Sequence, residues 1–103
     1  MKANKYQRIE EARIILGLGE DATRKEIRDA FRELSQKYHP DHCPQEELST
    51  CRAKFEKIVR AREVLERYCE NYRYSFREEE IRLQPESGEI ADHLDRFYGN
   101  YAI

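Results

Sequence analysis

The chain has 103 residues, of which 39% are charged and 39% are hydrophobic, and its mean hydropathy is -1.01. A chain of this length holds one domain with a modest core, and this composition suits amphipathic helices better than a β-sandwich or barrel. The formal net charge of -2 disfavours a nucleic-acid or anionic-membrane binder, because such proteins carry an overall basic excess.

The sequence contains no apolar run long enough to cross a bilayer, and residues 1–5 lead into a charged helix, unlike a signal peptide. We therefore expect a cytoplasmic protein with no membrane partner.

Apolar residues at helical spacing predict a first helix over residues 6–16, which Gly17 and Gly19 close.

A second helix is predicted from a capping box, in which Thr23 and Glu26 satisfy each other's backbone N–H groups. It runs to about Tyr38. The spacings of its apolar stripe are three and four residues, as expected for one helix face. The stripe consists of Ile27, Ala30, Phe31, Leu34 and Tyr38.

The stretch His39-Pro40-Asp41 ends this pattern, because proline lacks an N–H and pushes the residue before it out of the α region. A third helix is predicted from about Glu46 to at least Tyr68. Its inward face comprises Leu48, Cys51, Phe55, Ile58, Ala61 and Leu65. The apolar faces of the second and third helices bury each other only if the two run antiparallel. The tripeptide is therefore expected at the solvent-exposed tip of a helical hairpin.

Basic residues repeat along one flank of the second helix. They are Arg24, Arg28 and Arg32 at intervals of four, with Lys25 beside them. The opposite flank carries Glu26, Asp29 and Glu33. On an arbitrary helix such a run of charges is usually a solvated face, whose ion pairs contribute little to stability. Next to the tripeptide we favour a docking stripe for an acidic partner surface, because charge localised on one flank steers association.

The cysteines Cys43, Cys51 and Cys69 are odd in number and lack C-x-x-C spacing. We therefore expect no disulfide framework and no zinc site, with Cys51 and Cys69 packing as small apolar side chains. A set drawn from His39, His42 and these cysteines matches no familiar zinc pattern. Cys43 beside a histidine has no evident orienting group or oxyanion donors, so catalysis, a metal and a cofactor are not expected.

Taken together, these blocks resemble the J-domain of DnaJ-type proteins over about Ala12 to Leu65. The matching stretches are Ile15-Leu16-Gly17-Leu18, residues 26–34, Lys37-Tyr38-His39-Pro40-Asp41, Lys54-Phe55-Glu56-Lys57-Ile58 and Glu63-Val64-Leu65. The resemblance implies an all-α fold, with a first helix packed across an antiparallel hairpin of the second and third. It also implies a co-chaperone that binds a DnaK-type chaperone and stimulates its ATP hydrolysis.

By position, the resemblance makes His39, Pro40 and Asp41 the triggering loop. It assigns partner binding to Arg28, Phe31, Arg32 and Lys37, and the flank geometry adds Arg24 and Lys25. Such a module is not an enzyme, since it acts by favouring a competent conformation of the chaperone. The alternative is an interaction module that keeps the fold without stimulating an ATPase.

Residues 1–76 are expected to form this domain and residues 77–103 a C-terminal extension. Residues 77–83 either continue the third helix or form a short helix after a break, and Pro85 to Gly88 reads as a turn. A further helix is predicted from Ile90, Leu94, Phe97 and Tyr98, with Gly99 as its stop. We favour packing of this extension on the domain. The alternative is an exposed anchor for a client or partner, made by Phe97, Tyr98, Tyr101 and Ile103.

Overall fold

The computed structural model describes residues 3–85, which form helices and no strands. The helices are α1 (Lys5–Ile15), α2 (Arg24–Tyr38), α3 (Leu48–Glu70) and α4 (Glu78–Leu83), with two 3-10 turns between α2 and α3, η1 (Pro40–His42) and η2 (Gln45–Glu47). The all-α prediction is confirmed. None of the helices in this described part combines the length and apolar character that crossing a bilayer requires.

Local signals determine where α1 and α2 begin. Thr23 Oγ1 accepts from the Glu26 N–H at 3.1 Å, and the Glu26 carboxylate accepts from the Thr23 N–H at 3.2 Å. The predicted capping box is therefore formed. Asn4 and Gln7 make the same reciprocal pair at the start of α1, at 2.8 and 3.1 Å. These bonds satisfy donors that the first helical turn otherwise leaves open.

The end of α1 depends on Gly17, whose φ of +71° lies in the left-handed region. The Leu18 N–H bonds to the Arg13 carbonyl and the Gly17 N–H to the Ile14 carbonyl, both at 3.0 Å, which is the Schellman arrangement. Arg13 strengthens this turn by donating to the Leu18 carbonyl at 3.0 Å. Its hydrogen bond to Glu10 also lowers the pKa of that carboxyl below its ordinary value.

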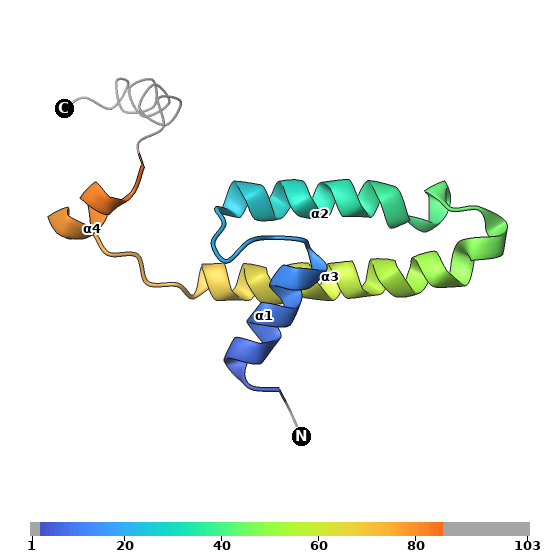
Figure 1. Cartoon of the computed structure of the whole chain (residues 1–103), viewed down its shortest axis with the longest axis horizontal. Helices are drawn as coiled ribbons and strands as arrows, with labels where there is room; N and C mark the ends of the chain where they lie inside the picture. The colour runs from blue at the N-terminus through green and yellow to red at the C-terminus, as the bar shows by residue number, and fades with distance from the viewer. Residues whose placement is uncertain (1–2, 86–103) are drawn as a thin grey trace. The chain divides into compact units, whose positions relative to one another are not determined.

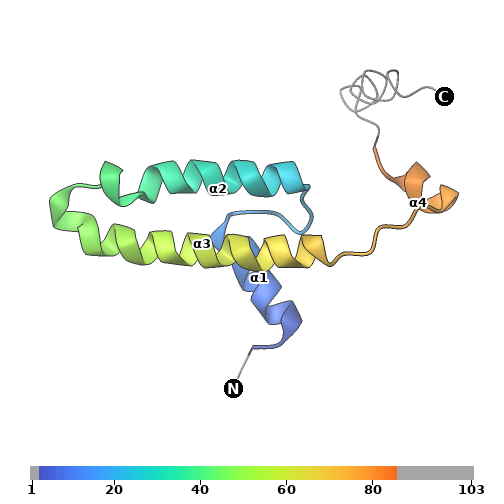
Figure 2. The ribbon, with the colours of Figure 1, turned by 180° about the vertical axis from the view of Figure 1, so that it is seen from behind.

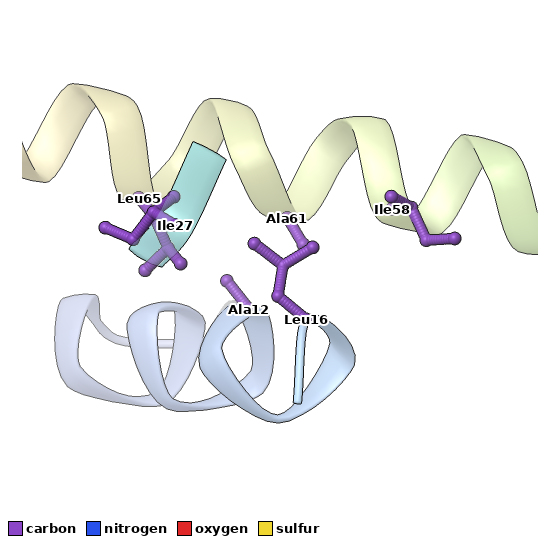
Figure 3. Close-up of a cluster of buried hydrophobic side chains, with 6 residues drawn as sticks. All are labelled: Ala12, Leu16, Ile27, Ile58, Ala61 and Leu65. Atoms are coloured by element: carbon purple, nitrogen blue, oxygen red, sulfur yellow. The ribbon is translucent and has the colours of Figure 1, made fainter. Parts of the chain in front are cut away.

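The second and third helices run side by side in opposite directions, and α1 crosses α3 (Figures 1 and 2). All three contribute to one buried cluster, which consists of Ala12, Leu16, Ile27, Ile58, Ala61 and Leu65 (Figure 3). Ala12 and Ala61 are 2% and 3% exposed. Their small side chains let α1 approach α3 closely, and Leu16 lies beside Ala61 in the gap. The predicted arrangement of three helices is confirmed.

We expect Thr23→Ala to destabilise the domain by about 1 kcal/mol, because the substitution removes an N-cap acceptor. Thr23 is exposed, so no core packing is lost. Chemical denaturation monitored by circular dichroism measures the change. Thr50→Ala is the matched control, since Thr50 is exposed within the first turn of α3 and makes no cap bond there. Equal losses for the two variants would show that the capping box contributes nothing.

The prediction that the cysteines form no disulfide is wrong. Cys43, in the loop, and Cys51, in the first turn of α3, are bonded to each other, with their Cα atoms 6.6 Å apart. Cys69 is the free cysteine; it is half-buried and packs against the core cluster, as expected for a small apolar side chain.

The chain divides into two compact units, residues 1–72 and residues 73–103. In the second unit α4 follows the non-helical residues 72–77, so it is a separate short helix and does not continue α3. Arg82 pairs with Glu78 within it. Three predicted features lie outside the described residues. They are residues 86–88 of the predicted turn, the predicted helix of residues 90–98, and the aromatic anchor made by Phe97, Tyr98, Tyr101 and Ile103. Packing of the extension on the domain stays a prediction.

Candidate functional site

The tripeptide His39-Pro40-Asp41 lies at one end of the hairpin, where the chain turns from α2 towards α3 (Figure 1). The His39 N–H still bonds to the Ser35 carbonyl at 2.8 Å, which is the last helical bond of α2. His39 itself is extended, with φ -61° and ψ 135°, as expected for a residue that precedes proline. Pro40 then opens η1, where a missing N–H has no cost.

The His39 side chain organises this turn. Its Nδ1 accepts a hydrogen bond from the Asp41 N–H at 3.1 Å and thereby caps η1. The ring packs edge-on against Phe55 of α3, with centroids 5.3 Å apart, and against His42 at 5.9 Å. The imidazole is therefore held by α3 as well as by its own turn.

Asp41 presents its carboxylate to solvent. Its side chain is 85% exposed, compared with 42% for His39. Asp41 Oδ2 lies 3.6 Å from His39 Nδ1, and the turn is closed by the His42 N–H bonding to the His39 carbonyl at 2.9 Å. The backbone is thus ordered while the carboxylate remains open. It can accept charge-assisted hydrogen bonds from a cationic group on another protein.

The basic flank, defined here as Arg24, Lys25, Arg28 and Arg32, follows α2 towards this turn, and Lys37 lies in the last turn of the helix. Its members are all exposed. Within residues 3–85, Arg28 and Arg32 make no ion pair, whereas Arg24 lies 3.7 Å from Glu66 of α3. Lys37 Nζ lies over the Tyr38 ring, 5.3 Å from its centroid. The two central arginines consequently keep their charge available to a partner.

Phe31 differs from the exposed basic residues of α2 because it is half-buried and packs against the core cluster. The guanidinium of Arg62, on α3, lies over its ring at 4.4 Å. Lys54 Nζ, also on α3, lies 5.0 Å from the Tyr38 ring centroid. These contacts add two cations of α3 to the surface beside α2. The periodicity of a single helix does not predict such contacts between helices.

The described residues do not form a metal site. Among residues 3–85 no group of three or more His, Cys, Asp and Glu side chains is arranged to hold a metal ion. The predicted residues His39, Pro40 and Asp41 are brought together at the tip, and the basic flank leads to them along α2.

Comparison with known proteins identifies this arrangement. Residues 14–74, more than half of the chain, match the family model of the DnaJ domain. The chain belongs to the DnaJ-domain family. The matched region contains the whole of α2, the tripeptide turn and α3, and it extends beyond the stretch that the sequence motifs cover.

Curated relatives resemble this DnaJ domain over half of the chain or slightly more. Chaperone protein DnaJ 1 of Corynebacterium diphtheriae is 51% identical over 51 residues, which are 50% of this chain and 13% of the relative. Chaperone protein DnaJ of Prosthecochloris aestuarii is 42% identical over 60 residues, 58% of this chain and 15% of the relative. Chaperone protein dnaJ 72 of Arabidopsis thaliana is 41% identical over 54 residues, 50% of this chain and 29% of the relative.

The similarity therefore concerns the DnaJ domain, and it covers less than a third of the length of each of these three relatives. No solved structure gives a significant match to the chain.

Proposed function

We propose that this protein is a co-chaperone, which binds a DnaK-type chaperone through the His39-Pro40-Asp41 turn and the basic flank and stimulates its ATP hydrolysis. The observation that carries the proposal is the open Asp41 carboxylate on an ordered turn within a DnaJ domain. The alternative is a DnaJ-domain interaction module that does not stimulate an ATPase. The protein itself is not proposed to be an enzyme, because hydrolysis takes place on the chaperone.

The order of the turn supports tight docking on energetic grounds. A free loop would lose conformational entropy on binding, at about 1–2 kcal/mol per backbone residue. Here the His39 cap and the contact with Phe55 already hold Asp41 in place before a partner arrives. Binding energy from Asp41 is therefore available to favour one chaperone conformation over another, and this difference is what shifts an equilibrium.

The basic flank supports the second half of the proposal. Arg28 and Arg32 lie on one exposed side of α2, and their charge is not neutralised by an ion pair within residues 3–85. Such a local field speeds the approach of an acidic surface even though the net charge is -2. Asp29 and Glu33, on the opposite flank, would be repelled by the same surface, so the field also favours one orientation.

A single-turnover hydrolysis assay tests the proposal. A DnaK-type chaperone is preloaded with ATP, and release of phosphate is followed with and without the wild-type chain. We expect a rate increase that saturates with the concentration of the chain. Binding to the ATP-bound chaperone without any increase in rate would support the alternative module.

We expect Arg28→Ala together with Arg32→Ala to weaken binding to the chaperone roughly 5- to 30-fold, as for a loss of about 1–2 kcal/mol at a charged interface. Both side chains are exposed, so the melting temperature should change little. Surface plasmon resonance at two salt concentrations measures the effect, and the variant should lose most of the salt dependence. Arg8→Ala, an exposed arginine of α1, is the control. An equal loss for Arg8→Ala would contradict the docking role of α2.

The expectation of a cytoplasmic location and of a client bound by the C-terminal aromatic residues stays a prediction.

A further inference from the structure

The disulfide begins at the residue that ends the proposed docking turn. Cys43 is the residue that ends η1, two positions after Asp41, and Cys51 belongs to the first turn of α3. The covalent ring between them encloses η2 and the beginning of α3. It therefore ties the segment that leaves the tripeptide to the helix that supports it.

Among the described residues, few other bonds hold the segment between η1 and the start of α3 in place. Pro44 and Glu47, the N-cap residues of η2 and α3, make no side-chain cap hydrogen bond, in contrast to Asn4 and Thr23 at the starts of α1 and α2. The Cys43 N–H bonds to the Pro40 carbonyl at 3.3 Å, a long bond, and the Glu47 N–H bonds to the Pro44 carbonyl at 3.0 Å. The disulfide thus stands where a helix start would otherwise depend on side-chain capping.

We propose that Cys43 and Cys51 are a reversible thiol–disulfide site that controls the order of the His39-Pro40-Asp41 turn, and that the oxidised form is the more active co-chaperone. The part concerning activity depends on the proposed function. The part concerning order of the turn does not.

The two cysteines differ in access in the way that a reversible site requires. Cys43 is half-exposed, whereas Cys51 is only 8% exposed. The Cys43 thiolate attacks a low-molecular-weight disulfide and forms a mixed disulfide, with release of one small thiol. The Cys51 thiolate then attacks the Cys43 sulfur and releases the second small thiol. In total, the two protein thiols lose two electrons and two protons, and the small disulfide takes up both and becomes two thiols.

The reduced form has a place in the same fold. Cys43 Sγ lies 3.5 Å from the Glu47 carbonyl, so a thiol there has an acceptor for its proton. This weak bond does not replace a covalent one, and the start of α3 becomes free to open. When only a fraction of molecules presents Asp41 correctly, the apparent affinity for a partner falls by that fraction.

Cys69 provides a matched control. It lies in the last turns of α3, eighteen positions beyond Cys51, and packs against the core cluster without a disulfide. Its replacement by serine leaves the proposed site unchanged, whereas Cys43→Ser and Cys51→Ala each remove the bond.

The first experiment measures order without a chaperone. The full chain is prepared oxidised or reduced, its thiols are counted by alkylation and mass spectrometry, and amide hydrogen exchange is followed across residues 40–50. We expect at least tenfold faster exchange after reduction, together with a melting temperature lower by roughly 5–15 °C, as for the opening of a ring of this size. Cys43→Ser and Cys51→Ala should resemble reduced wild type in either state, and Cys69→Ser should respond like wild type. Unchanged exchange on reduction would overturn the proposal.

The second experiment measures stimulation of a DnaK-type chaperone by oxidised and reduced chain at a concentration below saturation. We expect the oxidised form to stimulate three- to tenfold more, and Cys43→Ser to be insensitive to the redox state. Insensitivity of the variant also excludes an effect on cysteines of the chaperone. Equal stimulation by both forms of wild type would overturn redox control of activity. If neither form stimulates while exchange still responds to reduction, the proposed function fails and the thiol–disulfide site stands.

Discussion

Replacement of Asp41 by asparagine is expected to abolish stimulation of the chaperone while leaving the fold intact. Asparagine has nearly the same shape as aspartate but lacks its charge, so the variant loses a charge-assisted hydrogen bond to the partner. Loss of one member of a desolvated charge pair costs about 2–5 kcal/mol, which corresponds to roughly 30-fold or more in affinity. The single-turnover assay described above measures this loss.

The fold should tolerate the substitution because the Asp41 side chain is 85% exposed. The bond that caps η1 uses the Asp41 backbone N–H, which asparagine retains. We therefore expect the circular dichroism spectrum to be unchanged and the melting temperature to shift by no more than about 2 °C.

Asp29→Asn is the matched control, since it is the same substitution at an exposed position on the opposite flank of α2. It should stimulate as wild type does or slightly better, because it removes a negative charge near an acidic partner. Full stimulation by Asp41→Asn would refute the central role that we propose for this carboxylate.

Replacement of Ile58 by alanine is expected to produce the largest loss of stability. Ile58 is 4% exposed and belongs to the buried cluster at the middle of α3 (Figure 3). Truncation of a buried isoleucine removes hydrophobic burial and leaves a cavity, at a cost of about 2–5 kcal/mol. For a domain of this size that corresponds to a fall in melting temperature of roughly 10–25 °C. Thermal unfolding followed by circular dichroism at 222 nm measures it.

The identical substitution at Ile14 is the control, because Ile14 is 61% exposed on α1. There the loss of burial is small, and alanine is the better helix former. We expect a change within about 0.5 kcal/mol, as for a surface substitution. Similar destabilisation by the two variants would show that the cluster around Ile58 does not hold the three helices together.

The same local signals that place these side chains made much of the fold predictable. The Thr23 capping box and the break at Pro40 both depend on residues within four positions of each other. As predicted, the first sets the start of α2 and the second sets its end. The apolar stripes of α2 and α3 each predict one inward face, and two such faces allow only an antiparallel hairpin when the connecting loop is short. The position of the tripeptide at the tip of the hairpin follows from these same signals, whereas the resemblance to the J-domain depends on the residues of the matching stretches.

The partners of individual side chains were less predictable. The apolar stripe predicts that Phe31 packs on the core, as it does, but it does not predict that the guanidinium of Arg62 lies over the Phe31 ring. Arg24, predicted to lie on the basic flank, lies 3.7 Å from Glu66 of α3. Both contacts join α2 to α3, and their register depends on how far the two helices slide along each other, which no pattern within either helix specifies.

By itself, the sequence determined the three helices of residues 5–70, which of their faces are apolar and where His39-Pro40-Asp41 interrupts them, because periodicity, caps and proline act over a few neighbouring residues. Only the tertiary structure decided that His39 is held against Phe55 and that Cys43 pairs with Cys51. The physical reason is that two 3-10 turns set the path of the loop, and this path brings side chains on separate elements to within bonding distance.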